Sequence, residues 1–389
     1  MCRYLIVVDD IWDITIWEKI SCALPDNTFR YRIITTTRNN AVAEQVGIVY
    51  ELKPLCLHDS RRLFYPRLFG NDDNVICLTG DLIILYQTKK CASVPLAIIS
   101  IDTLLASKGR NKWEMYKVYR SVTAELENSL DLQDLGMILS LSYHNLPPHL
   151  KFCLLHLSVF PGDYDIDKDR LVRLWIAEGF IQCEIPGESL FDLGETYYHE
   201  LKNRLMIQPV YRRWDNETIE YCLVNDMGLD LICSKSKEED FVTVYNDVYQ
   251  TYSSEKRLSF QNSMVDHARH LTSMNMQQVR SLVVFPFAVN LMPALLSFRV
   301  LRVLDLQDCH LSHRYILKDL RNLIHMRYLG LRRTHIAQLS KEIGNLQLLQ
   351  TLDVTGNGGA SEQEVEKVEA ALRNEIAMHH NHPSLEIHW

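Results

Sequence analysis

A spaced pattern of leucines in the last third of the 389-residue sequence constrains its fold most strongly. Three copies of L-x-x-L-x-L-x-x-C/N, one of them ending in threonine, run over Leu301–Cys309, Met326–Thr334 and Leu349–Asn357. A weaker copy begins at Val279. The copies begin 22, 25 and 23 residues apart, within the roughly 20–29 residues typical of leucine-rich repeats. Stacked copies share a core, so a short solenoid is predicted over 279–360, with a leucine-rich helical bundle as the alternative.

The first 50 residues predict part of a parallel sheet. Tyr4–Val8 and Arg32–Thr37 are short β-rich runs, and Ile14–Leu24 between them has helical spacing. Strand, helix and strand in this order form a βαβ unit. Polar residues at the carboxyl ends of such strands lie where open α/β sheets bind ligands.

The middle of the chain predicts further domains. Residues 51–135 have mainly helical spacing, and 136–235 alternate helices with short strands. Within the latter, Asn203–Leu223 predicts a hairpin that turns near Asp215–Asn216. A polar stretch at 234–239 and a connector over 236–278 follow. Residues 361–389 depart from the repeat and predict a terminal helix and tail, which would cap the solenoid.

Composition excludes several classes of protein. The formal charge of −8 provides no global positive field to hold nucleic acid or an anionic membrane. No apolar run approaches the roughly 20 residues that span a bilayer, and the N-terminus has no secretory pattern. Ten scattered cysteines favour a reducing compartment. The sequence therefore predicts a soluble intracellular protein.

Two consecutive aspartates end the first predicted strand. In nucleotide-binding sheets such a carboxylate reaches Mg²⁺, usually through water, and a second one orients the attacking water. Asp9 and Asp10 fit these roles, although an aspartate after an apolar run is also an ordinary helix cap. Arg38, after the second strand, could sense a terminal phosphate or form a surface salt bridge.

Six ordered motifs carry a resemblance to a known family. They are YLIVVDDIWD (4–13), RIITTTR (32–38), YELKPL (50–55), SVPLAI (93–98), LPPHLKFCLLHLSVFPGDYDI (146–166) and LVRLWIAEGFI (171–181). Together with the trailing repeats, the series resembles the plant intracellular disease-resistance proteins, which are nucleotide-binding, leucine-rich-repeat receptors (NB-ARC proteins). The resemblance covers nearly the whole chain. It implies a multidomain α/β protein with a partial P-loop-NTPase-type sheet, a helical domain, a winged helix and a leucine-rich-repeat solenoid.

The resemblance also implies a function and its residues. In this family ADP holds the receptor closed, and exchange for ATP opens it toward oligomerisation and immune signalling. Asp9 would then bind Mg²⁺ and Asp10 would be its catalytic neighbour. Arg38 would sense phosphate, Pro95 would lie against the adenine, and the winged helix over 136–235 would close over the nucleotide.

The sequence departs from the family pattern at two places. The family's Met-His-Asp or Val-His-Asp triplet is replaced by Val224, Asn225 and Asp226. Asparagine donates a hydrogen bond but cannot carry the charge of a protonated imidazole, which implies a weaker ADP latch. The alternative is that Asn225 replaces one neutral donor with another.

The second departure is that no G-x-x-x-x-G-K-[ST] motif occurs, because the sequence begins beyond that point of the family's nucleotide domain. Four missing charge-assisted bonds would remove roughly 6 kcal/mol of binding, or about four orders of magnitude in affinity. We therefore expect an N-terminally truncated chain that is not an active ATPase.

Two functional hypotheses follow. The first is an ADP/ATP-switched plant immune receptor with protein partners: a pathogen effector or guarded host protein, and other resistance proteins. It would have no nucleic-acid partner and no integral membrane segment, and would be cytoplasmic or join immune complexes at membranes or in the nucleus. The second is a nucleotide-independent interaction module (a decoy or adaptor) or a non-functional receptor fragment.

Overall fold

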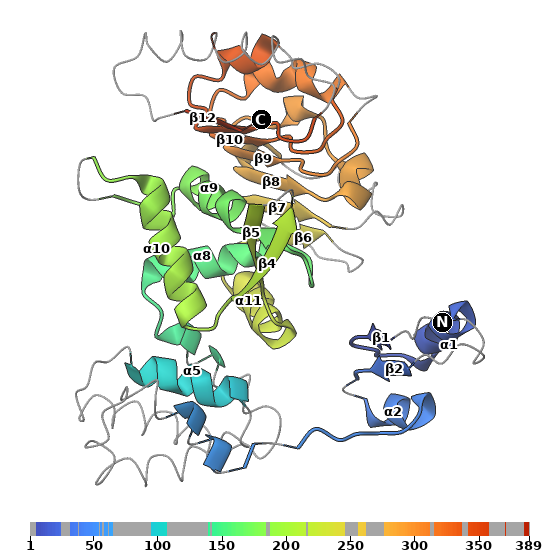
Figure 1. Ribbon diagram of the computed structural model, residues 1–389. Coiled ribbons are helices and arrows are strands. Elements are labelled where there is room, and N and C mark those ends of the chain that lie inside the picture. Colours follow the sequence, from blue (N-terminus) through green and yellow to red (C-terminus); the bar gives the residue numbers. More distant parts are fainter. Residues whose placement is uncertain are drawn as a thin grey trace. The chain divides into compact units, whose positions relative to one another are not determined.

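The computed structural model divides the chain into two compact units, residues 1–55 and 56–389, each described here by itself (Figure 1). The structure describes residues 5–24, 32–37, 39–53, 55–56, 58–60, 62–64, 95–106, 139–140, 142–183, 187–214, 217–245, 256–261, 276–311, 315–336, 341–357, 370 and 385–388.

The first unit contains the predicted βαβ arrangement. Strands β1 (Leu5–Val8) and β2 (Arg32–Thr35) pair in parallel, with Leu5 opposite Arg32. Helix α1 (Ile14–Ala23) lies between them in the chain, and α2 (Asn40–Val46) follows. Both helices begin at a side-chain cap, which satisfies a backbone donor that has no partner within the helix. Asp13 accepts from the Thr15 amide, and Asn39 accepts from the Ala41 amide.

The second unit contains a winged helix. Its elements are α8 (Pro148–His156), β3 (Ile166–Asp167), α9 (Lys168–Glu178), α10 (Leu190–Asn203), β4 (Gln208–Trp214), β5 (Glu217–Leu223) and α11 (Asp226–Glu238), and α5 (Pro95–Ala106) precedes them. The three strands form an antiparallel sheet of order β3-β5-β4. Pairing of Gln208 with Leu223 through Trp214 with Glu217 confirms the predicted hairpin. Its two turn residues lie outside the described residues.

A parallel seven-stranded sheet follows the winged helix in the second unit. Its order is β12-β11-β10-β9-β8-β7-β6. The strands are β6 (Thr243–Tyr245), β7 (Arg257–Phe260), β8 (Ser281–Val284), β9 (Val303–Asp305), β10 (Tyr328–Gly330), β11 (Thr351–Asp353) and β12 (Glu386–His388). One leucine of each predicted repeat occupies the same register across the sheet: Leu282, Leu304, Leu329 and Leu352. All four are fully buried in one core, so the stacking predicted from the repeat is confirmed.

The solenoid sheet extends beyond the predicted repeats at both ends. Strand β7 lies within the segment expected to be a connector and pairs with β8. Strand β12 lies in the expected C-terminal tail and pairs with β11. Each of these strands has only one or two apolar residues, too few to form a recognisable period. The expected helix over 362–376 lies outside the described residues, apart from Ala370. The polar stretch at 234–239 includes the last turns of α11.

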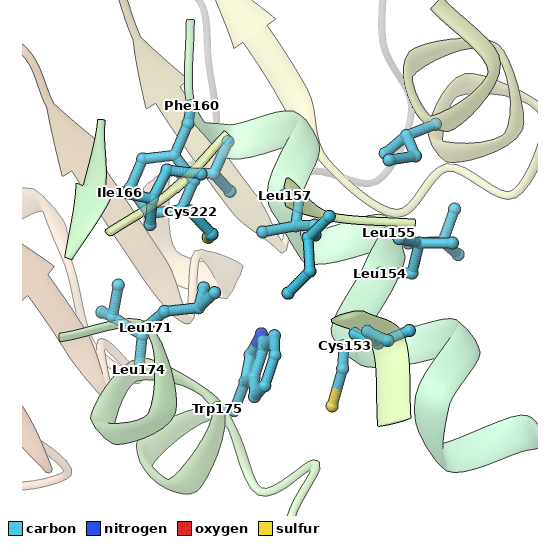
Figure 2. Packing of buried hydrophobic residues seen from close by; sticks show 14 of the residues in the cluster. Cys153, Leu154, Leu155, Leu157, Phe160, Ile166, Leu171, Leu174, Trp175 and Cys222 are labelled. Carbon is cyan, nitrogen blue, oxygen red and sulfur yellow. The ribbon is translucent and has the colours of Figure 1, made fainter. Parts of the chain in front are cut away.

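The winged helix has its own core, which Figure 2 shows from close by. Trp175 on α9 and Cys153, Leu154 and Leu155 on α8 are fully buried in it. Val283, Val303 and Tyr328 of the repeat strands belong to the same cluster. One face of the repeat strands therefore completes the core of the winged helix, while the repeat leucines form a separate core.

Candidate functional site

The predicted nucleotide-binding aspartates lie at the carboxyl end of β1, beside the end of β2. The Thr36 hydroxyl donates a short hydrogen bond to Asp9 Oδ1 and accepts one from the Asp10 amide at 2.9 Å. The Ile11 amide continues the pairing and donates to the Thr36 carbonyl at 2.9 Å. Thr36 thus positions both aspartates, a role that the sequence analysis missed. Its only sequence signal is its place near the end of the second strand.

The two aspartates differ in conformation. Asp10 has a φ of 56°, in the left-handed region that aspartate tolerates better than most residues, and its Oδ2 accepts from Trp12 Nε1 at 2.6 Å. Asp9 is exposed, and its Oδ2 has no hydrogen-bond partner among the described residues. Mg²⁺ in nucleotide sites keeps several waters and takes one or two carboxylates. Asp9 fits such a role, although within the described ranges no three His, Cys, Asp or Glu side chains converge on a metal site.

The other predicted residues lie elsewhere in the chain. Arg38 falls outside the described residues. Pro95 is exposed and begins α5. Asn225 caps α11, because its Oδ1 accepts from the Gly228 amide at 2.8 Å, and Asp226 is the first residue of that helix. A side chain at Gly228 would crowd this cap, since a Cβ there would lie 3.3 Å from Asn225 Oδ1. The cap occupies the oxygen of Asn225 and leaves its amide nitrogen to act as a donor.

A polar site of the second unit joins α9 to the repeat strands. Arg170 on α9 and Asp305 at the end of β9 are both buried, 3% and 0% exposed. Arg170 donates to Asp305 Oδ2 from Nε at 2.9 Å, and its Nη2 lies 2.7 Å from the same oxygen. Its Nη1 donates to the Tyr164 hydroxyl at 2.9 Å. Burial raises the pKa of Asp305, and the Arg170 charge opposes that rise.

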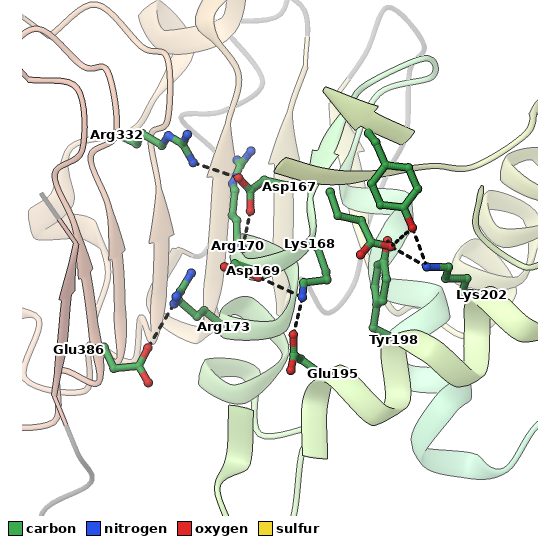
Figure 3. A network of polar contacts seen from close by, with 12 residues as sticks. Asp167, Lys168, Asp169, Arg170, Arg173, Glu195, Tyr198, Lys202, Arg332 and Glu386 are labelled. Atoms are coloured by element: carbon green, nitrogen blue, oxygen red, sulfur yellow. Dashed lines mark hydrogen bonds and ion pairs between the residues drawn. The ribbon is translucent and has the colours of Figure 1, made fainter. Parts of the chain in front are cut away.

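Two further ion pairs, which Figure 3 shows, join the winged helix to the repeat strands. Arg332, which follows β10, lies with its Nη1 3.1 Å from Asp167 Oδ2. Asp167 also caps α9, because its Oδ1 accepts a hydrogen bond from the Arg170 amide. Arg173 on α9 contacts Glu386 on β12 at 3.2 Å. Glycine at position 330 gives Asp305 its space, because a Cβ there would lie 2.6 Å from Asp305 Oδ1.

A third polar contact lies at the other end of α9. Glu178 accepts from Arg257 Nε of β7 at 2.8 Å, and the Arg257 guanidinium lies 4.3 Å from the ring centre of Phe241. His156 lies 4.0 Å from Glu178 and is fully buried. Neither of its ring nitrogens has a hydrogen-bond partner within the described structure. Burial lowers the pKa of His156 to about 4, and the nearby charges of Arg257 and Arg170 add to the effect while Glu178 opposes it.

These contacts place α9 over one face of the repeat sheet. In each repeat strand the residues beside the central leucine face the opposite side from the solenoid core. All eight of them, from β8 to β11, are buried: Ser281, Val283, Val303, Asp305, Tyr328, Gly330, Thr351 and Asp353. This face is therefore closed by the winged helix over β8 to β10. The sequence alone does not indicate this closed face, because the paired charges lie up to 213 residues apart and no local period marks them.

Comparison with known proteins identifies the domains. The NB-ARC domain model matches residues 1–67, the disease resistance protein winged helix domain matches 159–232, and a leucine-rich repeat region matches 278–359. Three of the four predicted domains are thus matched, and they occur in the predicted order. The parallel strands β1 and β2, with Asp9 and Asp10 after β1, fall within the first match. Helix α9 falls within the second match.

Named relatives are similar along most of the chain. Disease resistance protein Pik-2 of Oryza sativa subsp. japonica is 33% identical over 364 residues, which cover 90% of this chain and 35% of Pik-2. Putative disease resistance RPP13-like protein 3 of Arabidopsis thaliana is 34% identical over 371 residues, covering 91% of this chain and 42% of that protein. The chain thus spans 35–42% of the length of these relatives.

The chain belongs to the family of disease resistance proteins that combine an NB-ARC domain, a winged helix and leucine-rich repeats. Among its described helices, none has both the length and the apolar character needed to cross a membrane.

Proposed function

We propose that the chain acts in plant innate immunity as part of a nucleotide-switched disease resistance receptor. The observation that carries this proposal is the attachment of the repeats to the winged helix through Arg170 and Asp305. In the family the winged helix closes over the nucleotide. Repeats joined to it by buried contacts would follow its motion, which would couple nucleotide exchange to the recognition surface.

The nucleotide would be ADP or ATP with Mg²⁺. When bound, Mg²⁺ would supply charge neutralisation for the phosphates. Asp9 would hold it through water at the end of β1, and Thr36 would fix the carboxylate in place. Arg38 would contact a phosphate, Pro95 would lie against the adenine, and Asn225 would donate from its amide nitrogen beside Asp226.

Protein partners are proposed from the same family resemblance. They are a pathogen effector or a guarded host protein, together with other resistance proteins. The proposed location is the cytoplasm, with recruitment to membranes or to the nucleus as part of immune complexes.

A second candidate function is a nucleotide-independent interaction module. It is favoured by the lack of a G-x-x-x-x-G-K-[ST] motif in the 389 residues. Such a chain would act through its winged helix and repeats as a decoy or adaptor.

Calorimetry with ADP and Mg²⁺ on the purified 389-residue chain distinguishes the two candidates. The switch proposal predicts saturable binding, weakened about tenfold in Asp9→Asn when Mg²⁺ is present and unchanged by that substitution in EDTA. The motif's absence predicts a Kd weaker than about 10 µM. A Kd tighter than this would rule out the nucleotide-independent candidate. No saturable heat up to about 1 mM ADP would rule out nucleotide switching by this chain.

A further inference from the structure

A cavity of about 350 Å³ lies where the winged helix meets the start of the repeat sheet. Its walls come from the segment that follows α8, from the second half of α11, from residues 242–244 at β6 and from the residue after β7 (Figure 1). Asp9, Pro95 and Asn225 do not line it. Ligand pockets in proteins measure roughly 300–1,000 Å³, so a cavity of this size suits a small molecule.

The walls of the cavity are connected by hydrogen bonds. Ser158, in the short 3-10 helix after α8, donates from Oγ to Ser236 Oγ of α11 at 2.9 Å. The Val242 amide, just before β6, donates to the same Ser236 oxygen at 3.2 Å. The apolar part of the lining consists of Phe160, Leu229, Val242 and Val244. Because the fold itself holds these segments together, a ligand would enter a pre-formed site and lose little affinity to ordering it.

Two opposite charges line the same cavity without forming an ion pair with each other. Lys237 lies in the last turn of α11, and Asp240 follows the helix by two residues. The Asp240 amide donates to the Lys237 carbonyl at 3.3 Å, so one turn positions both residues. Both are exposed, and within the described part of the chain neither side chain has a hydrogen-bond or ion-pair partner. The cavity therefore offers one free cation and one free anion side by side.

Asp240 is not the residue that helix stability alone would favour at its position. Its φ is 47°, a left-handed conformation in which helices usually end at glycine. A carboxylate at the C-terminal end of a helix is also disfavoured by the helix dipole. The same dipole attracts positive charge, so the end of α11 and the Asp240 carboxylate together favour an ammonium group beside the cavity.

We propose that this cavity binds a free apolar amino acid. Lys237 would bind its carboxylate, Asp240 would bind its ammonium group, and the apolar lining would surround its side chain. An apolar acid without an amine would leave Asp240 beside a second anion, and an apolar amine without a carboxylate would leave Lys237 beside a second cation. Since the lining comes from both α11 and β6, the ligand would contact the winged helix and the repeat sheet at once. This inference does not depend on nucleotide binding.

Calorimetry with three matched probes and the full 389-residue chain tests the proposal. The probes are L-phenylalanine, 3-phenylpropionate, which lacks the ammonium group, and phenethylamine, which lacks the carboxylate. We expect L-phenylalanine to bind saturably with a Kd below about 1 mM. Each analogue should bind at least about tenfold more weakly, because it loses one charge-assisted hydrogen bond.

Two substitutions assign each charge to its partner. In Lys237→Met the preference for L-phenylalanine over phenethylamine should disappear, because the carboxylate no longer has a cation to bind. In Asp240→Asn, which keeps a residue that tolerates the left-handed conformation, the preference over 3-phenylpropionate should disappear. The matched control is Lys235→Met on the same helix, because Lys235 pairs with Glu238 at 2.7 Å and does not line the cavity. It should bind all three probes as the unaltered chain does, and circular dichroism checks that each variant is folded.

Three results would overturn the proposal. The first is a Kd for L-phenylalanine above about 1 mM. The second is equal binding of L-phenylalanine and either analogue by the unaltered chain, which would mean that the cavity takes a simple apolar acid or amine instead. The third is that both preferences persist in Lys237→Met and Asp240→Asn, because the amino acid would then bind somewhere else.

Discussion

Replacing Arg170 with methionine is expected to lower the free energy of unfolding by about 3–5 kcal/mol at neutral pH, because the change leaves a buried carboxylate without its partner. Asp305 is 0% exposed, and its burial raises its pKa. Without Arg170 the carboxyl would therefore either stay charged at high cost or take up a proton. Urea denaturation followed by circular dichroism measures the effect.

A double substitution separates this charge effect from lost packing. Arg170→Met/Asp305→Leu removes both charges, and a buried ion pair replaced by apolar groups of similar volume is often neutral or stabilising. We expect it to recover most of the stability lost in Arg170→Met. An Arg170→Met variant within about 1 kcal/mol of the unaltered chain would contradict a structural role for this pair.

The second large effect concerns pH and His156. Its pKa is about 4 in the folded protein and near 6.5 in an unfolded chain. Between about pH 6.5 and pH 4 the unfolded state therefore binds more protons at this histidine than the folded state does. The free energy of unfolding consequently falls as the pH is lowered through this range. A shift of this size corresponds to about 3 kcal/mol once the pH is below 4.

His156→Leu isolates this contribution. Neither ring nitrogen has a hydrogen-bond partner among the described residues, so leucine removes the titrating group without breaking such a bond. The unfolding free energy of the variant, measured from pH 7 to pH 4, should decrease less steeply than that of the unaltered chain. Parallel curves for the two proteins would show that His156 does not titrate in this range.

The fold was predictable wherever a short period repeats. The leucines at 282, 304, 329 and 352 occupy one register because each repeat places one strand beside the last. The hairpin over 208–223 was predictable from two β-rich runs around a turn signal. Strand β7 was missed because Leu258 and Phe260 are its only apolar residues, and two alternating positions do not establish a period.

The sites were less predictable than the fold. Asp9 and Asp10 could be placed at the end of a strand, but Thr36, which holds them, depends on how β1 and β2 pair. Asn225 was expected to contact nucleotide, and its role as the cap of α11 follows from the local backbone. The contact between Arg170 and Asp305 joins residues 135 positions apart. Only the packing of α9 on the repeat strands brings these two residues together.

The central claim is that the winged helix and the first repeats form one folded unit, with α9 closing the face of the sheet. Native-state hydrogen exchange in increasing denaturant tests it most directly, because elements of one cooperative unit open with the same free energy. We expect amides of α9 and of β9 and β10 to converge on one opening free energy, and Arg170→Met to lower it for all three elements. Protection of β9 and β10 that persists after α9 has opened would contradict it.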